Sequence, residues 1–208
     1  MKTKRYVKSW LKSYGEISLD HLKFSAILAG RLVDEGVLSL GEIEEQTGMK
    51  MRRLKNFVKK RPRTIFDENH KIAGHGPIVL ETTNQVLKIG DKTVYTPTPW
   101  DALLSVFYLD REVVWKTSCS LTGEAIEVKV LSEGIETKQE GIYISFLHPD
   151  EMTNDKLDAI KNWCVPLLKD DIADQFLEQH QQQVAIPLSQ AYQFARDVFF
   201  SWASSSPD

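Results

Sequence analysis

The spacing of apolar residues changes about a third of the way along the chain, and this change limits the fold to a mixed one. Before it, the segments "RYVKSWLKSY" and "SLDHLKFSAILAGRLVDEG" carry apolar residues three and four positions apart, as amphipathic helices do. Ser18 is a candidate N-cap for the second of these helices, and Gly36 is a candidate stop. After the change, "IVLETTNQVLKIGDKTVYT" alternates around the turn "IGDK", which predicts a β-hairpin.

The segment "SLGEIEEQTGMKMRRLKNFVKKRP" predicts two short helices joined by a tight turn. Ser39 and Glu42 form a capping-box pattern, "TGM" supplies the turn, and the second helix is expected from about Lys50 until Pro62 ends it. The next segment, "TIFDENHKIAGHG", predicts a strand, a turn and a strand. This order of elements is typical of a winged helix-turn-helix, so residues 1–75 are predicted to form a helical domain of that kind.

The remaining residues, 76–208, mix strands and helices. A helix is expected from Thr98, two strands should flank the turn "SLTGEA", and "GIYISFLHP" predicts a further strand. Helical spacing returns in "NDKLDAIKNWC", "DDIADQFLEQH" and "SQAYQFARDVFFSW". The fold class is therefore α+β: an N-terminal winged-helix-like helical domain followed by a small, mostly antiparallel sheet with helices.

The charge is distributed unevenly along the chain. Residues 1–63 carry 15 Lys and Arg against 7 Asp and Glu, a net charge of +8, whereas residues 64–208 carry 11 against 22, a net charge of −11. The stretch Lys50–Arg63 holds eight cations and no acid. It could lie on DNA and contact phosphates, although apart from Asn56 it lacks the Asn or Gln that would make base readout convincing. The alternative is a solvated helix face in a module reused for packing.

Several classes of protein are disfavoured by the sequence. No apolar run approaches the roughly 20 residues that span a bilayer, so we expect a cytoplasmic protein with no membrane partner. No G-x-S-x-G elbow and no glycine-rich phosphate loop is present. No two histidines have a metal-ligand spacing such as H-x-x-x-H, and we expect all five at the surface or in turns: His21, His70, His75, His148 and His180.

Cysteine and carboxylate side chains remain as candidates for chemistry. In "TPTPWDALL", Thr98 is placed to cap a helix that starts at Pro99, and Asp101 falls in its first turn. A helix N-terminus lowers the pKa of a carboxyl, so Asp101 should stay ionised unless burial or a charged neighbour offsets this effect. Cys164 lies between a helix and a proline, either exposed in a loop or buried as a small apolar residue. Cys119 precedes a hairpin turn and is expected to be structural, and both thiols should be reduced.

At these residues the sequence resembles the organomercurial (alkylmercury) lyases. The resemblance runs in order through "FDENHKIAGHGP", "LETTNQVLKIGDKTVYTPTPWDALL", "SCSLTG", "NWC" and "VAIPLSQAY". It implies a winged-helix-like domain packed on an α+β core, and it implies protonolysis of a carbon–mercury bond. In that family two cysteine thiolates hold Hg(II), and an aspartate relays the proton to the departing carbon.

The resemblance also implies roles for individual residues. Asp101 matches the family's aspartate, Cys164 matches the later catalytic cysteine, and Cys119 matches a cysteine regarded as structural. The first catalytic cysteine falls at Thr98, whose hydroxyl is a poor ligand for mercury. The implied catalytic residues are Asp101, Cys164 and Thr98. Cys164 and Asp101 would be the metal ligands, for Hg(II) or another soft metal ion, and no cofactor is required.

Three functions follow from these observations. The first is a lyase with a reduced thiol site, which acts on a small organometallic compound and uses a thiol donor from solution. The second is a repurposed member of the family that binds another metal or a small molecule. The third is a regulator that binds nucleic acid through Lys50–Arg63. For the first two, we expect Asp101 and Cys164 to lie close together across a pocket roofed by Trp100 and Trp163.

Overall fold

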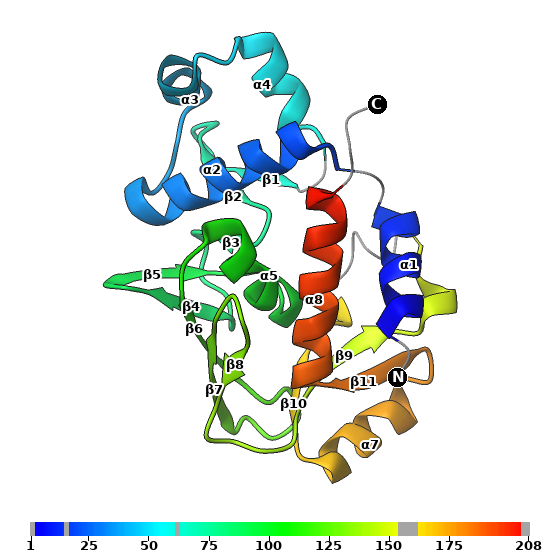
Figure 1. Ribbon diagram of the computed structural model, residues 1–208. Helices are drawn as coiled ribbons and strands as arrows, with labels where there is room; N and C mark the ends of the chain where they lie inside the picture. The colour runs from blue at the N-terminus through cyan, green and yellow to red at the C-terminus, as the bar shows by residue number, and fades with distance from the viewer. Residues whose placement is uncertain (1–2, 15–16, 61–62, 154–161, 205–208) are drawn as a thin grey trace.

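Two antiparallel sheets and a set of helices make up the computed structural model, which describes residues 3–14, 17–60, 63–153 and 162–204 (Figure 1). Among these residues, one sheet has eight strands in the order β1-β2-β3-β5-β4-β6-β7-β8, and the other has three in the order β10-β9-β11. No helix within the described ranges is both long enough and apolar enough to cross a membrane. The mixture of helices with antiparallel sheet agrees with the predicted α+β class.

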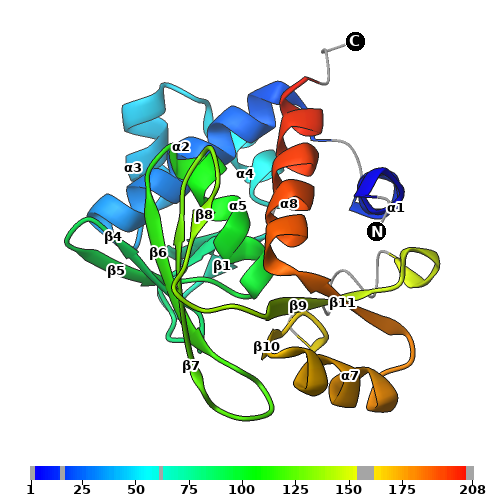
Figure 2. The same ribbon diagram turned by 60° about the horizontal axis from the view of Figure 1, so that its bottom comes forward.

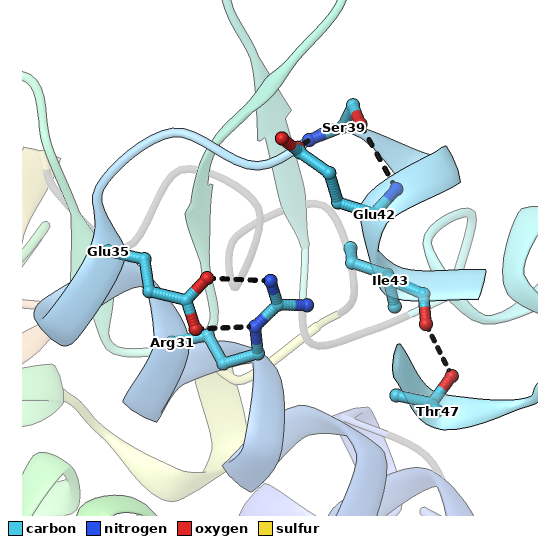
Figure 3. Close-up of polar contacts among 6 residues, drawn as sticks. All are labelled: Arg31, Glu35, Ser39, Glu42, Ile43 and Thr47. Atoms are coloured by element: carbon cyan, nitrogen blue, oxygen red, sulfur yellow. Dashed lines mark hydrogen bonds and ion pairs between the residues drawn. The ribbon is translucent and has the colours of Figure 1, made fainter. Parts of the chain in front are cut away.

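The N-terminal helices begin and end where their capping residues predict. α1 (Thr3–Tyr14) is followed by α2 (Leu19–Glu35), whose N-cap Ser18 accepts a hydrogen bond from the backbone of His21. α3 (Leu40–Thr47) starts with the predicted capping box: Ser39 accepts from the Glu42 backbone, and the Glu42 carboxylate accepts from the Ser39 backbone. Figure 3 shows this box beside the Arg31–Glu35 ion pair of α2. Gly48 then ends α3 in the left-handed conformation.

The second helix of this pair is shorter than predicted. α4 spans Met51–Phe57, whereas the sequence predicted a helix up to Pro62. The backbone N–H groups of Val58 and Lys60 donate to the carbonyls of Leu54 and Phe57. These residues form a turn at the end of the helix. Because a proline forces the residue before it out of the helical conformation, the chain has to leave the helix before that point.

The predicted hairpin after α4 is present and is joined to the larger sheet. β1 (Thr64–Phe66) pairs with β2 (Ile72–His75), and β2 continues the sheet by pairing with β3 (Ile78–Val79). The sheet is therefore larger than the small one that we predicted. Helix, turn, helix and hairpin follow one another as expected, while the winged-helix character and the division at residue 75 stay predictions.

The other strands come mostly from the segments with alternating residues. The larger sheet contains β4 (Val86–Ile89), β5 (Lys92–Tyr95), β6 (Val113–Ser118), β7 (Ala125–Val130) and β8 (Ile135–Glu136). The smaller sheet contains β9 (Ile142–Leu147), β10 (Pro166–Leu168) and β11 (Gln183–Pro187). The predicted helix "NDKLDAIKNWC" falls largely on residues 154–161, outside the described ranges.

Helix α5 (Pro99–Leu109) lies at the centre of the fold. It packs against α2, against β6 and against α8 (Leu188–Ala203), and Figure 2 shows it between the long strands and α8. α1 covers the outer side of α8, and α7 (Asp170–Gln179) packs on the smaller sheet. The aromatic rings of Trp10, Trp100, Phe146 and Phe194 meet where α1, α5, β9 and α8 converge.

Two of the five histidines are buried, which makes the prediction of surface or turn positions wrong for His21 and His75. His75 is fully buried, and its two ring nitrogens contact the hydroxyls of Ser25 at 2.9 Å and Thr64 at 2.8 Å. The ring thus ties α2 to both strands of the β1–β2 hairpin. Burial, with a smaller effect from nearby His21, lowers the pKa of His75 to about 3.

We expect stability to fall in mild acid because His75 must stay neutral when the protein is folded. Its folded pKa lies below the unfolded value of about 6.5, so its contribution is present above that pH and is lost as the pH falls toward 3. Between pH 7 and pH 5 this loss should be about 2 kcal/mol. Urea unfolding at both pH values should show a smaller loss for His75→Asn than for the native chain. The exposed His70→Asn variant is the control, and equal losses in all three proteins would contradict the assignment.

Candidate functional site

Thr98 and Asp101 are joined by two hydrogen bonds at the start of α5. Thr98 is the N-cap in an extended conformation, and its hydroxyl oxygen accepts from the Asp101 backbone N–H at 3.1 Å. The same hydroxyl donates to Asp101 Oδ2 at 2.7 Å. Because Pro99 has no N–H to leave unsatisfied, the chain can turn into the helix at this point. The side chain of Asp101 is therefore held in one orientation.

Burial raises the pKa of Asp101 to about 7, although the hydrogen bond from Thr98 acts in the opposite direction. Burial therefore offsets the helix N-terminus, which is the condition under which Asp101 was not expected to stay ionised. No ion pair between described residues involves Asp101, so no cation opposes the effect of burial. A carboxyl with this pKa can both release and take up a proton near neutral pH.

Cys164 lies on the segment that leads into β10, and Ser145 of β9 holds the residues on both sides of it. The Ser145 hydroxyl donates to the Trp163 carbonyl at 2.5 Å and accepts from the Val165 N–H at 2.9 Å. The backbone N–H of Ser145 donates to the Val165 carbonyl at 2.9 Å. Cys164 is 2% exposed. Of the two alternatives for this residue, a buried position is therefore the observed one, and a loop-exposed position is not.

The Cys164 thiol interacts with the start of α5. Burial raises its pKa well above its usual range, and the nearby Asp101 carboxylate raises it further. A hydrogen bond from the Trp100 backbone N–H acts in the opposite direction, as does the nearby Thr98 side chain, whose one hydroxyl proton is donated to Asp101. Cys164 therefore carries its proton at neutral pH. The three residues predicted for the site, Thr98, Asp101 and Cys164, lie together.

The two tryptophans predicted to roof a pocket are both buried. The Trp100 ring packs into the core, with its centroid 4.7 Å from that of Trp10 and 4.4 Å from that of Phe194. It is the backbone of Trp100, rather than its ring, that contacts the thiol. Trp163 is 6% exposed and directly precedes Cys164. The pocket itself stays a prediction.

Cys119 is held at the other end of β10. Its sulfur accepts hydrogen bonds from the Thr122 hydroxyl and from the backbone N–H groups of Leu121, Thr122 and Leu168. Burial raises its pKa, but these bonds together outweigh burial and leave the pKa below its usual value. The Leu168 N–H ties Cys119 to the last residue of β10, whereas Cys164 lies before its first residue.

Sequence analysis missed Ser145, which fixes the peptide groups around Cys164. The one signal was a serine inside the apolar strand "IYISFL". Within the described ranges, no three or more His, Cys, Asp or Glu side chains gather as a metal site. The arrangement of Thr98, Asp101 and Cys164 offers one sulfur ligand for a soft metal and one acid beside it.

Comparisons with known proteins point to one family. The sequence profile of the alkylmercury lyase family matches residues 79–200. The alkylmercury lyase of Staphylococcus epidermidis is 22% identical over 167 residues, which cover 80% of this chain and 76% of that enzyme. The crystal structure of the mercury-bound form of MerB2 superposes with a TM-score of 0.70 and 18% identity, covering 98% of this chain and 99% of the other.

The hydrogen bond from Thr98 should be measurable in the titration of Asp101. We expect a midpoint near pH 7 for the native carboxyl in a carbon-13 NMR titration, because burial has raised its pKa. Thr98→Val removes the donor that stabilises the carboxylate, so the midpoint should rise by about one unit. Thr98→Ser keeps the hydroxyl and should leave the midpoint in place. A native midpoint near pH 4, or equal midpoints in Thr98→Val and Thr98→Ser, would contradict this account.

Proposed function

Because this chain belongs to the alkylmercury lyase family, we propose that it cleaves the carbon–mercury bond of small organomercurials at a site with a single protein thiol. The observation that carries the proposal is the 2.7 Å hydrogen bond between Thr98 and Asp101 beside the buried Cys164 thiol. This bond supports the proposal because the proton carrier and the sulfur that would bind mercury would then be neighbours.

Binding uses the Cys164 sulfur. Mercury is a soft metal and prefers sulfur ligands, and an organomercury cation already holds one carbon, so a single thiolate completes a two-coordinate complex. The raised pKa means that Cys164 gives up a proton only when the metal replaces it. Asp101, with a pKa of about 7, is the adjacent group able to accept that proton, and the Thr98 hydroxyl contacts both.

Cleavage returns the same proton to carbon. Asp101 donates its proton to the carbon bound to mercury while the electron pair of the carbon–mercury bond becomes the new carbon–hydrogen bond. The products are the hydrocarbon and Hg(II) bound to the Cys164 thiolate, with the Asp101 carboxylate left ionised beside it. Protons and charge balance: the thiol proton ends on the hydrocarbon, and no oxidant or reductant is required.

A second sulfur ligand has to come from outside the protein. The Thr98 hydroxyl is occupied by Asp101 and is a weak ligand for mercury, and Cys119 is anchored at the far end of β10. A small thiol from solution therefore completes the coordination of Hg(II) and carries it away. The rate should rise with thiol concentration and then level off.

The proposed reaction is tested by adding phenylmercury and excess small thiol and measuring benzene release. Asp101→Asn removes the proton carrier, so release should fall by about a hundredfold or more. Cys164→Ala should abolish both phenylmercury binding and benzene release. Cys119→Ala, which changes the other thiol, is the control and should retain turnover. Full turnover by Cys164→Ala would exclude the single-thiol site.

The Thr98→Cys variant distinguishes the hypothesis of a lyase from the hypothesis of a repurposed binding protein. If the native chain is a slow lyase, adding the second sulfur should speed benzene release at limiting thiol and reduce its dependence on added thiol. If the native chain binds phenylmercury stoichiometrically and releases no benzene, while Thr98→Cys does release it, the natural substrate is another metal compound or small molecule. Benzene release and bound mercury should therefore be measured on the same samples.

A further inference from the structure

A cationic surface on α4 and the turn after it plays no part in the proposed reaction. This basic surface consists of the exposed side chains Lys50, Arg52, Lys55, Lys59 and Lys60. The opposite side of the same segment is buried: Leu54, Phe57 and Val58 pack into the core. The apolar side explains why the segment folds against the protein, but it does not explain the concentration of positive charge on the other side.

Acidic neighbours do not neutralise this surface. Among the ion pairs between described residues, its segment contributes one, from Arg53 to Asp20 at 2.7 Å. Two glutamates of α3 keep their charge beside this surface but bind backbone N–H groups instead of pairing with its cations: Glu42 accepts from the Ser39 N–H, and Glu44 accepts from the Met51 N–H, each at 2.7 Å. Like charges held close together repel each other, so a surface of this kind is stabilised by an anionic partner.

We propose that the basic surface binds duplex DNA through its phosphates. α3, the turn at Gly48, α4 and the β1–β2 hairpin follow in the order that places the second helix of a helix-turn-helix against DNA. Arg52 and Lys55 lie three positions apart and Asn56 is one further, so the three share the outward side of α4. Lys59 and Lys60 extend the charge beyond the end of the helix.

The same residues favour DNA over an acidic protein segment. The outward side of α4 carries Arg52, Lys55 and Asn56, and the exposed apolar side chains of this module, Ile65 and Phe66, lie on β1 instead, whereas protein interfaces are built around apolar anchors at their centre. Arg52, Lys55 and Asn56 can each contact a base edge as well as a phosphate, so a random duplex is the probe that measures the phosphate contribution. The net charge of −11 on residues 64–208 opposes DNA binding, and salt at 0.1 M screens those of its charges that lie more than about 10 Å from the duplex.

The test is fluorescence anisotropy of the full chain with a labelled random duplex of about 20 base pairs, with sodium chloride raised from about 20 to 200 mM. We expect binding at low salt that weakens steeply, with a slope of log affinity against log salt that corresponds to about three to five phosphate contacts. Replacing both Arg52 and Lys55 by Gln should weaken binding at least tenfold at low salt and reduce the slope by about two contacts.

The matched control removes the same charge elsewhere. Lys88 and Lys92 are exposed on the β4–β5 hairpin, so the double change to Gln alters net charge equally and should leave DNA binding unchanged. Thermal unfolding of each variant checks that it is folded. No binding of the native chain at low salt would overturn the proposal, as would equal losses in both double variants. Capture of an acidic peptide by a chain that ignores the duplex would overturn it in favour of a protein partner.

Discussion

The burial of α5 is the constraint on which the rest of the structure depends. Nine of its eleven residues are buried, because α2, α8 and β6 surround it. A helix enclosed in this way must satisfy the N–H groups of its first turn from within the protein. The Thr98 hydroxyl accepts a hydrogen bond from one of these N–H groups, and Pro99 has no N–H that needs a partner. The polar first turn that results is also where the candidate site lies.

The chemistry of the site follows from that enclosure. Asp101 would have a low pKa at an exposed helix N-terminus, yet burial brings it to about 7, where gain and loss of a proton are nearly balanced. The same enclosure keeps the Cys164 thiol protonated at neutral pH. Packing that stabilises the fold therefore sets both proton affinities, and neither depends on an ion pair between described residues.

Features that depend on residues close together in the sequence were predicted well. Contacts between residues far apart in the sequence could not be predicted. The caps at Ser18 and Ser39 and the helix start at Thr98 depend on residues within four positions, and the structure has all three. The burial of His75 depends on Ser25, fifty positions away, and the raised pKa of Asp101 depends on surrounding helices and strands. Proximity of Asp101 and Cys164 was expected only through resemblance to the family, because nothing in their spacing brings them together.

The presence of threonine rather than cysteine at position 98 changes the chemical groups available at the start of α5. A cysteine there would be a thiolate ligand, since a helix N-terminus favours the charged form of a thiol. The threonine hydroxyl instead caps the helix and holds the Asp101 carboxyl, and these two bonds use both its oxygen and its proton. In the proposed reaction the missing sulfur must enter from solution. Thr98 and Cys164 are almost fully buried and Asp101 is partly exposed, so Asp101 is the residue of the three that solvent reaches.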